Sequence, residues 1–313
     1  MTASATGNSA DVAFHAAASL HDQGAGQYRV YEGALRAVIA LEAIFDSQAE
    51  SSENQSISVW VGSPDALLAS MSISLADTAG SSLAGSQQLG QPLSGSFQGG
   101  SGRDVYQGAV DGTRTTPAAI QQAVIDDAGG VNQLSATAAG FHESAKGIES
   151  SQLRFSTGFQ RVIVDLPAVG STVGVSGSSL ILGDGGSLMT VNLTAQASGD
   201  NRVQVGVSSS NLHAQGGHDV LLIRVSDPTP SGIGTLGTVT AFQAAASMGA
   251  GDDQVMLVAD NPGRSAAGLV RGVLDLGAGN DSLTIDSTGE GVLAAKLLGG
   301  DGADHLLVKA GRI

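Results

Sequence analysis

A seven-residue pattern recurs three times in the last third of the chain and limits the fold more than any other feature. Each copy reads Gly-x-Gly-x-Asp-x-aliphatic, and the copies are Gly249–Val255, Gly277–Leu283 and Gly300–Leu306. Glycine permits the left-handed backbone of a tight corner. An aliphatic residue two positions after the aspartate lies on the same side of the strand that follows. The pattern therefore predicts tight corners, each leading into a strand with one aliphatic side chain facing a core.

The surrounding sequence has the character of short strands. From Phe159 onward, aliphatic runs alternate with glycine turns, for example RVIVDL, LMTVNL, VLLIRV and SLTID. Strand-length runs at regular spacing, separated by Gly and Asp turns, are typical of stacked repeats. We therefore predict a mainly β protein in which residues 156–313 form a parallel β-helix or β-roll solenoid, with the glycine corners along one edge.

The last copy carries a further glycine, so that residues 299–307 read GGDGADHLL. This segment matches every fixed position of the nonapeptide Gly-Gly-x-Gly-x-Asp-x-aliphatic-x of calcium-binding β-helices. The C-terminal part of the chain, about residues 183–310, thus resembles the haemolysin-type (RTX) calcium-binding repeats. The resemblance implies Ca²⁺ held between adjacent turns, with candidate ligands at Asp253, Asp281 and Asp304 and at the corner residues Gly249, Gly251, Gly277, Gly279, Gly300 and Gly302.

Three weaker copies lie upstream of these corners. The copy at 217–221 keeps the second glycine and the aspartate, so Asp219 is also a candidate ligand. The copies at 199–203 and 183–189 carry Asn201 and Ser187 at the aspartate position, and a purely structural turn is favoured for both. The residues Asp252, Asn280 and Asp301 are expected to point into solvent or to assist.

The spacing of the aspartates departs from the usual head-to-tail array. Asp219, Asp253, Asp281 and Asp304 follow one another at 34, 28 and 23 residues. Each coil would therefore carry one motif corner and a longer path, which predicts a wider solenoid and fewer complete calcium sites. Calcium takes about six to eight oxygen ligands, more than one corner supplies, so neighbouring corners would have to share ions. Structural turns without metal remain the alternative.

The first half of the sequence predicts a different structure. Residues 28–48 carry an apolar stripe at three- and four-residue steps, which indicates an amphipathic helix. Residues 11–20 and a segment that begins at Thr116-Pro117 also have helical patterns, whereas 56–61 alternates like a strand. Residues 79–112 are rich in Gly, Ser and Gln and indicate a long loop. We expect residues 1–155 to form a mixed, partly helical region.

Composition excludes several partners. The formal net charge is −15 with only 14 Lys plus Arg, so nucleic acid, which needs clustered cations, is not an expected partner. There is no cysteine, which excludes thiolate metal sites and disulfides. No run reaches the roughly 20 apolar residues of a membrane span. The first 20 residues lack a basic segment followed by an apolar core, so we expect secretion or surface display by a route without an N-terminal signal peptide.

Catalytic motifs are not found in the sequence. His142-Glu143 does not extend to a zinc-protease HExxH, and no Gly-x-Ser-x-Gly elbow occurs. We therefore expect a non-enzymatic, exported, calcium-binding structural or adhesin-like bacterial protein, whose partner besides calcium is a surface polysaccharide, a protein or a second copy. The alternative is a metal-free β-solenoid that acts in surface interactions. A polysaccharide-acting β-helix enzyme is the third reading.

Overall fold

The structure is a computed structural model that divides into two compact units, Met1–Ser81 and Ser82–Ile313. It describes strand segments between residues 2 and 75, and then residues 92–100, 102–111, 118–139, 144–168, 171–195, 203–227, 238–261 and 265–312. None of the described residues is helical, and accordingly none lies in a helix long and apolar enough to cross a membrane.

The first unit contains two antiparallel sheets. One has the strand order β3-β4-β1-β6-β7, and the other pairs β2 with β5. The strands are β1 (Thr2–Thr6), β2 (Val12–Ala16), β3 (Leu20–Gly24), β4 (Gln27–Val30), β5 (Ile39–Ala43), β6 (Glu53–Trp60) and β7 (Leu67–Leu75). Strand β6 confirms the alternation predicted at 56–61.

The helices predicted in this unit are wrong wherever the structure describes them. Within the range 11–20, strand β2 covers residues 12–16 and β3 begins at residue 20. Within the range 28–48, β4 covers residues 28–30 and β5 covers residues 39–43. The remainder of both ranges lies outside the described residues. The physical reason for the error at β5 is that Ile39 and Leu41 also fit a two-residue period. Pairing with β2, which sets Leu41 opposite Phe14, uses that period instead of the helical one.

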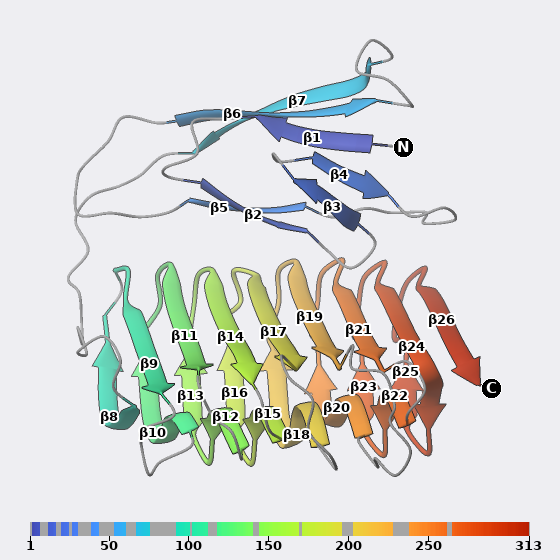
Figure 1. Ribbon diagram of the computed structural model, residues 1–313. Coiled ribbons are helices and arrows are strands. Elements are labelled where there is room, and N and C mark those ends of the chain that lie inside the picture. Colours follow the sequence, from blue (N-terminus) through green and yellow to red (C-terminus); the bar gives the residue numbers. More distant parts are fainter. Residues whose placement is uncertain are drawn as a thin grey trace. The chain divides into compact units, whose positions relative to one another are not determined.

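The second unit is a parallel β-solenoid (Figure 1), which confirms the predicted β architecture. Each strand pairs in parallel with its equivalents in the neighbouring coils. The strands are β8 (Leu93–Gly99), β9 (Val105–Asp111), β10 (Ala118–Asp127), β11 (Asn132–Ala139), β12 (Ser144–Glu149), β13 (Gln152–Phe155), β14 (Gln160–Ala168), β15 (Ser171–Ser176), β16 (Ser179–Leu182), β17 (Ser187–Ala195), β18 (Val203–Ala214), β19 (Asp219–Ser226), β20 (Thr238–Ser247), β21 (Gln254–Asp260), β22 (Ser265–Val270), β23 (Val273–Asp275), β24 (Ser282–Leu293), β25 (Lys296–Leu298) and β26 (His305–Arg312).

The solenoid begins earlier than the sequence indicated. Strands β8 and β9 lie within the segment 79–112 that was expected to be a loop, and β10 replaces the helix expected after Thr116-Pro117. Strands β8 to β13 all precede residue 156, so the expected division at 155 does not separate solenoid from non-solenoid. Stacking against neighbouring coils makes β10 a strand. Its Ile120 lies in register with Leu93 and with Ile148, and all three side chains are buried. A helix would not keep that register.

The core consists of apolar columns with one residue from each coil. One column runs from Tyr106 on β9 to Leu306 on β26, and its members between these ends are at most 3% exposed. They are Leu134, Val162, Met189, Leu221, Val255 and Leu283. The prediction that Val255, Leu283 and Leu306 stack is therefore confirmed. Their burial is confirmed for the first two only, because Leu306 on the last strand is 46% exposed.

A column of small residues lets opposite walls of the solenoid approach closely. It contains Gly147, Gly174, Gly206, Ala241, Gly268 and Gly291 in register. A Cβ atom on Gly174 would lie 2.5 Å from Cγ1 of Val191 on the opposite wall, and one on Gly268 would lie 2.2 Å from Cγ2 of Ile285. Glycine is thus required because a branched side chain fills the space in front of it.

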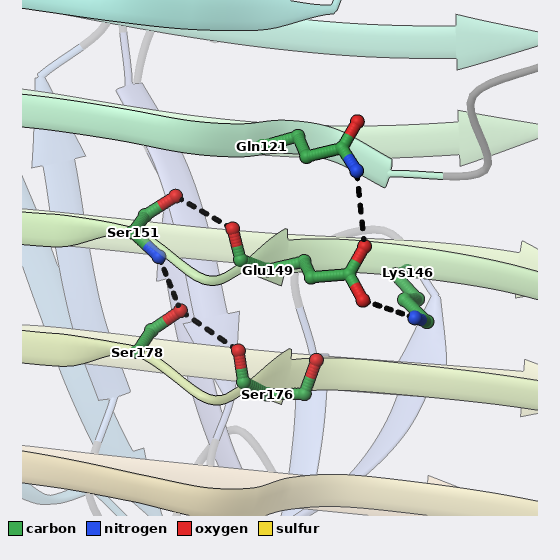
Figure 2. A network of polar contacts seen from close by, with 6 residues as sticks. All are labelled: Gln121, Lys146, Glu149, Ser151, Ser176 and Ser178. Atoms are coloured by element: carbon green, nitrogen blue, oxygen red, sulfur yellow. Dashed lines mark hydrogen bonds and ion pairs between the residues drawn. The ribbon is translucent and has the colours of Figure 1, made fainter.

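Stacked serines hold a second bend in three successive coils (Figure 2). The amide of Ser151 donates to Oγ of Ser178 (3.1 Å), and that hydroxyl donates to the carbonyl of Ser176 (2.9 Å). The amide of Ser178 donates in turn to Oγ of Ser210 (3.2 Å). The residue before the first of these serines, Ser150, has a left-handed φ of 49°. At these bends a serine hydroxyl of the next coil therefore satisfies an amide that the strands leave unpaired.

Candidate metal site

The candidate ligands lie in one column on one corner of the solenoid. The strand register sets Asp219 beside Asp253, Asp253 beside Asp281, and Asp281 beside Asp304. We call these four residues the aspartate column. Each member immediately precedes, or begins, the strand that its motif was predicted to start. The structure thus brings the sequence-predicted carboxylates together on neighbouring corners.

Hydrogen bonds between coils fix one oxygen of most of these carboxylates. The amide of Asp219 donates to Oδ1 of Asp253 (2.8 Å), and the amide of Asp253 donates to Oδ1 of Asp281 (2.8 Å). The amide of Asp281 donates to Oδ1 of Asp304 (3.1 Å). Each of these side chains therefore accepts a hydrogen bond from a backbone amide of the preceding coil. Charge-assisted bonds of this kind are stronger than neutral ones.

The second carboxylate oxygen is left without a hydrogen bond in three members. Oδ2 of Asp219, of Asp253 and of Asp281 is buried without a hydrogen-bond partner. These residues are 0%, 0% and 1% exposed. An orphaned, buried charged oxygen is costly, so such groups are normally paired or coordinate a metal. A row of orphaned oxygens is therefore the observation that fits a bound cation.

Burial and mutual repulsion raise the pKa of these carboxyl groups. Burial raises the pKa of Asp253 to about 7, and the neighbouring charges of Asp219 and Asp281 add to the rise. Burial raises the pKa of Asp219 to about 6, against hydrogen bonds from Ser187 that lower it. The pKa of Asp281 is raised by burial and by Asp304. Two charges one strand spacing apart, about 4.8 Å, repel by roughly 3 kcal/mol at an effective dielectric of 20.

The glycines of the corners have the predicted left-handed backbone. Gly249 and Gly251 have φ of 92° and 139°, and Gly277 and Gly279 have φ of 94° and 150°. The last corner repeats the values, with Gly300 at 94° and Gly302 at 132°.

Coil-to-coil bonds already use several carbonyls of the corners. The amide of Ala278 donates to the Gly249 carbonyl (2.8 Å), and the amide of Asp301 donates to that of Gly277 (3.0 Å). A carbonyl has two lone pairs, so a cation would take the second.

The carboxylates alone do not complete a coordination shell. Within the part of the chain that the structure describes, no group of three or more His, Cys, Asp or Glu side chains is gathered closely enough to hold a metal. Each interval of the column offers two carboxylates, so carbonyls and water would supply the remaining ligands of a calcium ion.

The column continues upstream of the predicted site. Asp104, Asn132, Gln160 and Ser187 precede Asp219 in register. Sequence reasoning identified only Ser187 among these. The signal was a glycine two residues before each polar residue and an apolar residue two after it, as in Gly130-Val-Asn132-Gln-Leu134. Residues 99–107, GGSGRDVYQ, even match the full nonapeptide if Tyr106 stands at its apolar position.

One weak copy does not belong to the column. Val203, which was aligned as its aliphatic residue, lies on β18 in register with Thr238 and is 43% exposed. Asn201 itself lies outside the described residues. The alignment of 199–203 was wrong, because Val203 begins β18, whose strand neighbours are β15, β16 and β20 and not the strands that follow the aspartate column.

A second, exposed row of hydrogen bonds runs beside the column. The amide of Asn280 donates to Oδ1 of Asp252 (2.8 Å), and the amide of Ala303 donates to Oδ1 of Asn280 (3.1 Å). The amide of Asp252 donates to Nδ1 of His218 (3.2 Å). These exposed side chains lie next to the aspartate column, and their hydrogen bonds connect successive coils.

Comparisons of the chain with models of protein families, with curated proteins and with solved structures found no match.

Proposed function

We propose that this protein is an extracellular, calcium-binding structural or adhesin-like solenoid, and that Ca²⁺ binds along the aspartate column. The observation that carries the proposal is the row of orphaned Oδ2 atoms on Asp219, Asp253 and Asp281. The column is acidic, rich in oxygen and free of sulfur, which is the ligand chemistry that calcium prefers.

The proposed sites are shared between coils. A cation between Asp253 and Asp281 would contact the orphaned Oδ2 of at least one of them, and corner carbonyls would contribute further oxygens. The ion would also screen the repulsion between adjacent carboxylates. Because stacked carboxylates exist only in the folded chain, binding energy becomes folding energy. The protein would then be most stable outside cells, where calcium is plentiful.

Thermal melting of the full chain tests the proposal. The protein is melted in EGTA, in millimolar CaCl₂ and in millimolar MgCl₂ at one ionic strength. A site occupied at 100 times its Kd adds about 2.7 kcal/mol, so calcium is expected to raise the Tm by at least about 5 °C. Magnesium, which demands a smaller octahedral shell, is expected to raise it less. Equal melting in all three buffers would refute the proposal.

The alternative function is a metal-free solenoid that acts by surface interactions. It is favoured by the bonds that Asp253, Asp281 and Asp304 already make to backbone amides, because these bonds give the carboxylates a structural role without metal. In that case protons, and not metal ions, would neutralise the carboxylates of the aspartate column. The same melting series separates the two functions, since the alternative predicts a Tm that depends on pH and is indifferent to calcium.

A further inference from the structure

We infer that calcium controls only one half of this solenoid, and that the other half is a scaffold that folds without the ion. The upstream half comprises residues 93–195 and the downstream half residues 203–312. The boundary is the contact between Ser187 and Asp219. The inference rests on the proposed function and adds to it where in the molecule calcium acts.

Neutral amide side chains at Asn132 and Gln160 connect the coils in the column of the upstream half. Oδ1 of Asn132 accepts the amide of Asp104 (2.9 Å), and Nδ2 of Asn132 donates to Oε1 of Gln160 (3.3 Å). Nε2 of Gln160 donates to the carbonyls of Thr157 (2.7 Å) and Gly158 (2.8 Å). An amide side chain both donates and accepts, so it connects successive coils without adding charge.

Asp104 and Asp127 are the buried carboxylates among the described residues of the upstream half, and of the two only Asp104 belongs to the column. Asp104 has the neutral Asn132 as its neighbour in the next coil, and its Oδ2 accepts the amide of Gly100 (2.8 Å). Its Oδ1 is buried without a hydrogen-bond partner, but no second carboxylate stacks on it within the column. Asp127 lies outside the column, and both of its oxygens are bonded, to Tyr106 Oη (2.8 Å) and to the amide of Gly129 (3.0 Å). No two carboxylates stack in successive coils of this part of the column.

The column of the downstream half contains only acceptors. Asp219, Asp253, Asp281 and Asp304 follow in consecutive coils, and none of them can donate once ionised. The first three keep an orphaned, buried oxygen. A cation is the group that balances this arrangement at neutral pH. Without it, the stacked charges oppose the same hydrogen bonds that hold the coils together.

The chemistry changes at one contact. Oγ of Ser187 donates to Oδ1 of Asp219 across a coil of 32 residues (2.5 Å). Ser187 is the last neutral residue of the column, and its hydroxyl is the donor. Asp219, which accepts this bond, is the first of the four consecutive carboxylates. Upstream of this bond the coils are 28 or 27 residues long, and downstream of it they range from 34 to 23. The change in coil length and the change from a neutral to a charged column therefore occur at the same coil.

Hydrogen exchange measured by mass spectrometry on the full chain tests the inference. At pH 7.5, replacing millimolar calcium by EGTA is expected to accelerate exchange by about tenfold or more in β19, β21, β24 and β26. Exchange in β11 and β14 is expected to change by less than about twofold. Acceleration of both halves together would overturn the inference but leave calcium binding intact. Absence of any change would overturn the proposed function and the inference with it.

Two substitutions exchange the chemistry of the halves. The double variant Asp253→Asn/Asp281→Asn gives the downstream column the amides that the upstream column has, and is expected to remove the calcium effect on exchange while keeping protection in EGTA. The variant Asn132→Asp stacks a carboxylate on Asp104 and also removes the amide that donates to Oδ1 of Asp127 (2.9 Å). It is expected to make β9 and β11 sensitive to calcium. If the double variant is unprotected even with calcium while Asn132→Asp behaves as wild type, charge in the column does not set the boundary.

Discussion

The backbone amide of Asp253 donates a 2.8 Å hydrogen bond to Oδ1 of Asp281, which lies 28 residues further along the chain. The same rule holds at the serine bend, where the amide of Ser151 donates to Oγ of Ser178. In both places a side chain accepts a hydrogen bond from a backbone amide of the preceding coil. Removing such a side chain is therefore expected to disturb a neighbouring coil rather than its own strand.

The serine bend gives the first prediction. Replacing Ser178 by Ala removes the acceptor of the buried Ser151 amide, and an orphaned buried donor costs about 1 to 3 kcal/mol. The matched control is Ser179→Ala, one residue along on β16, whose half-exposed side chain points outward. Urea unfolding is expected to show the loss for Ser178→Ala only. Equal midpoints for the two variants would mean that water replaces the hydroxyl.

The corner glycines give the second prediction. Gly251 has a φ of 139°, and a Cβ atom there would lie 1.7 Å from the Gly217 carbonyl oxygen. Gly251→Ala is therefore expected to reduce the free energy of unfolding by at least about 2 kcal/mol. Gly102 occupies the same motif position in the first coil, and a Cβ atom there meets nothing within 4 Å. Gly102→Ala is expected to change stability by less than about 1 kcal/mol, and an equal loss in both variants would contradict this account.

The sequence allowed the corners to be predicted because their chemistry is local. A left-handed glycine, an aspartate and an aliphatic residue within seven positions leave few conformations. The structure has the predicted left-handed backbone at Gly251 and the predicted core-facing strand residue at Val255. The stacking of three such corners followed from their repetition, since each corner alone exposes an apolar residue that needs a neighbour.

Most corners of the upstream coils were not recognised in the sequence, because their chemistry varies. Asn132, Gln160 and Ser187 satisfy the same position with three different polar groups, so no fixed letter repeats. In β10, the segment AAIQQAVIDD has a helical composition, and only its register with β8 and β13 makes it a strand. Long-range pairing of this kind overrides local propensity and is invisible in one segment read alone.

The raised pKa values of the column give the third prediction. The folded-state pKa of about 7 for Asp253 exceeds the value of about 3.9 of an unfolded chain. Between these values the folded protein binds more protons than the unfolded one, so in EGTA its stability falls as the pH rises from 5 to 8. Melting across this range is expected to show that fall. Asp253→Asn, which cannot titrate, is expected to flatten it, and identical pH profiles for the two proteins would contradict the assignment.

Calcium and protons compete for the same oxygens, which gives the fourth prediction. Ligating carboxylates must be deprotonated, so the increase of Tm caused by calcium is expected to be larger at pH 8 than at pH 5. The measurement is melting in calcium and in EGTA at both pH values. An increase that is independent of pH would place the ion away from the groups with raised pKa.

The most direct test of the central claim compares Asp281→Ala with Asp304→Ala. Asp281 lies between two carboxylates of the column, whereas Asp304 has one such neighbour, Asp281. The quantity compared is the increase of Tm from EGTA to calcium within each protein, and the exposed Asp286 on β24, replaced by Ala, serves as the control. We expect the control to keep the wild-type increase, Asp304→Ala to lose part of it, and Asp281→Ala to lose the most. Equal increases in all three variants would contradict calcium binding between stacked aspartates.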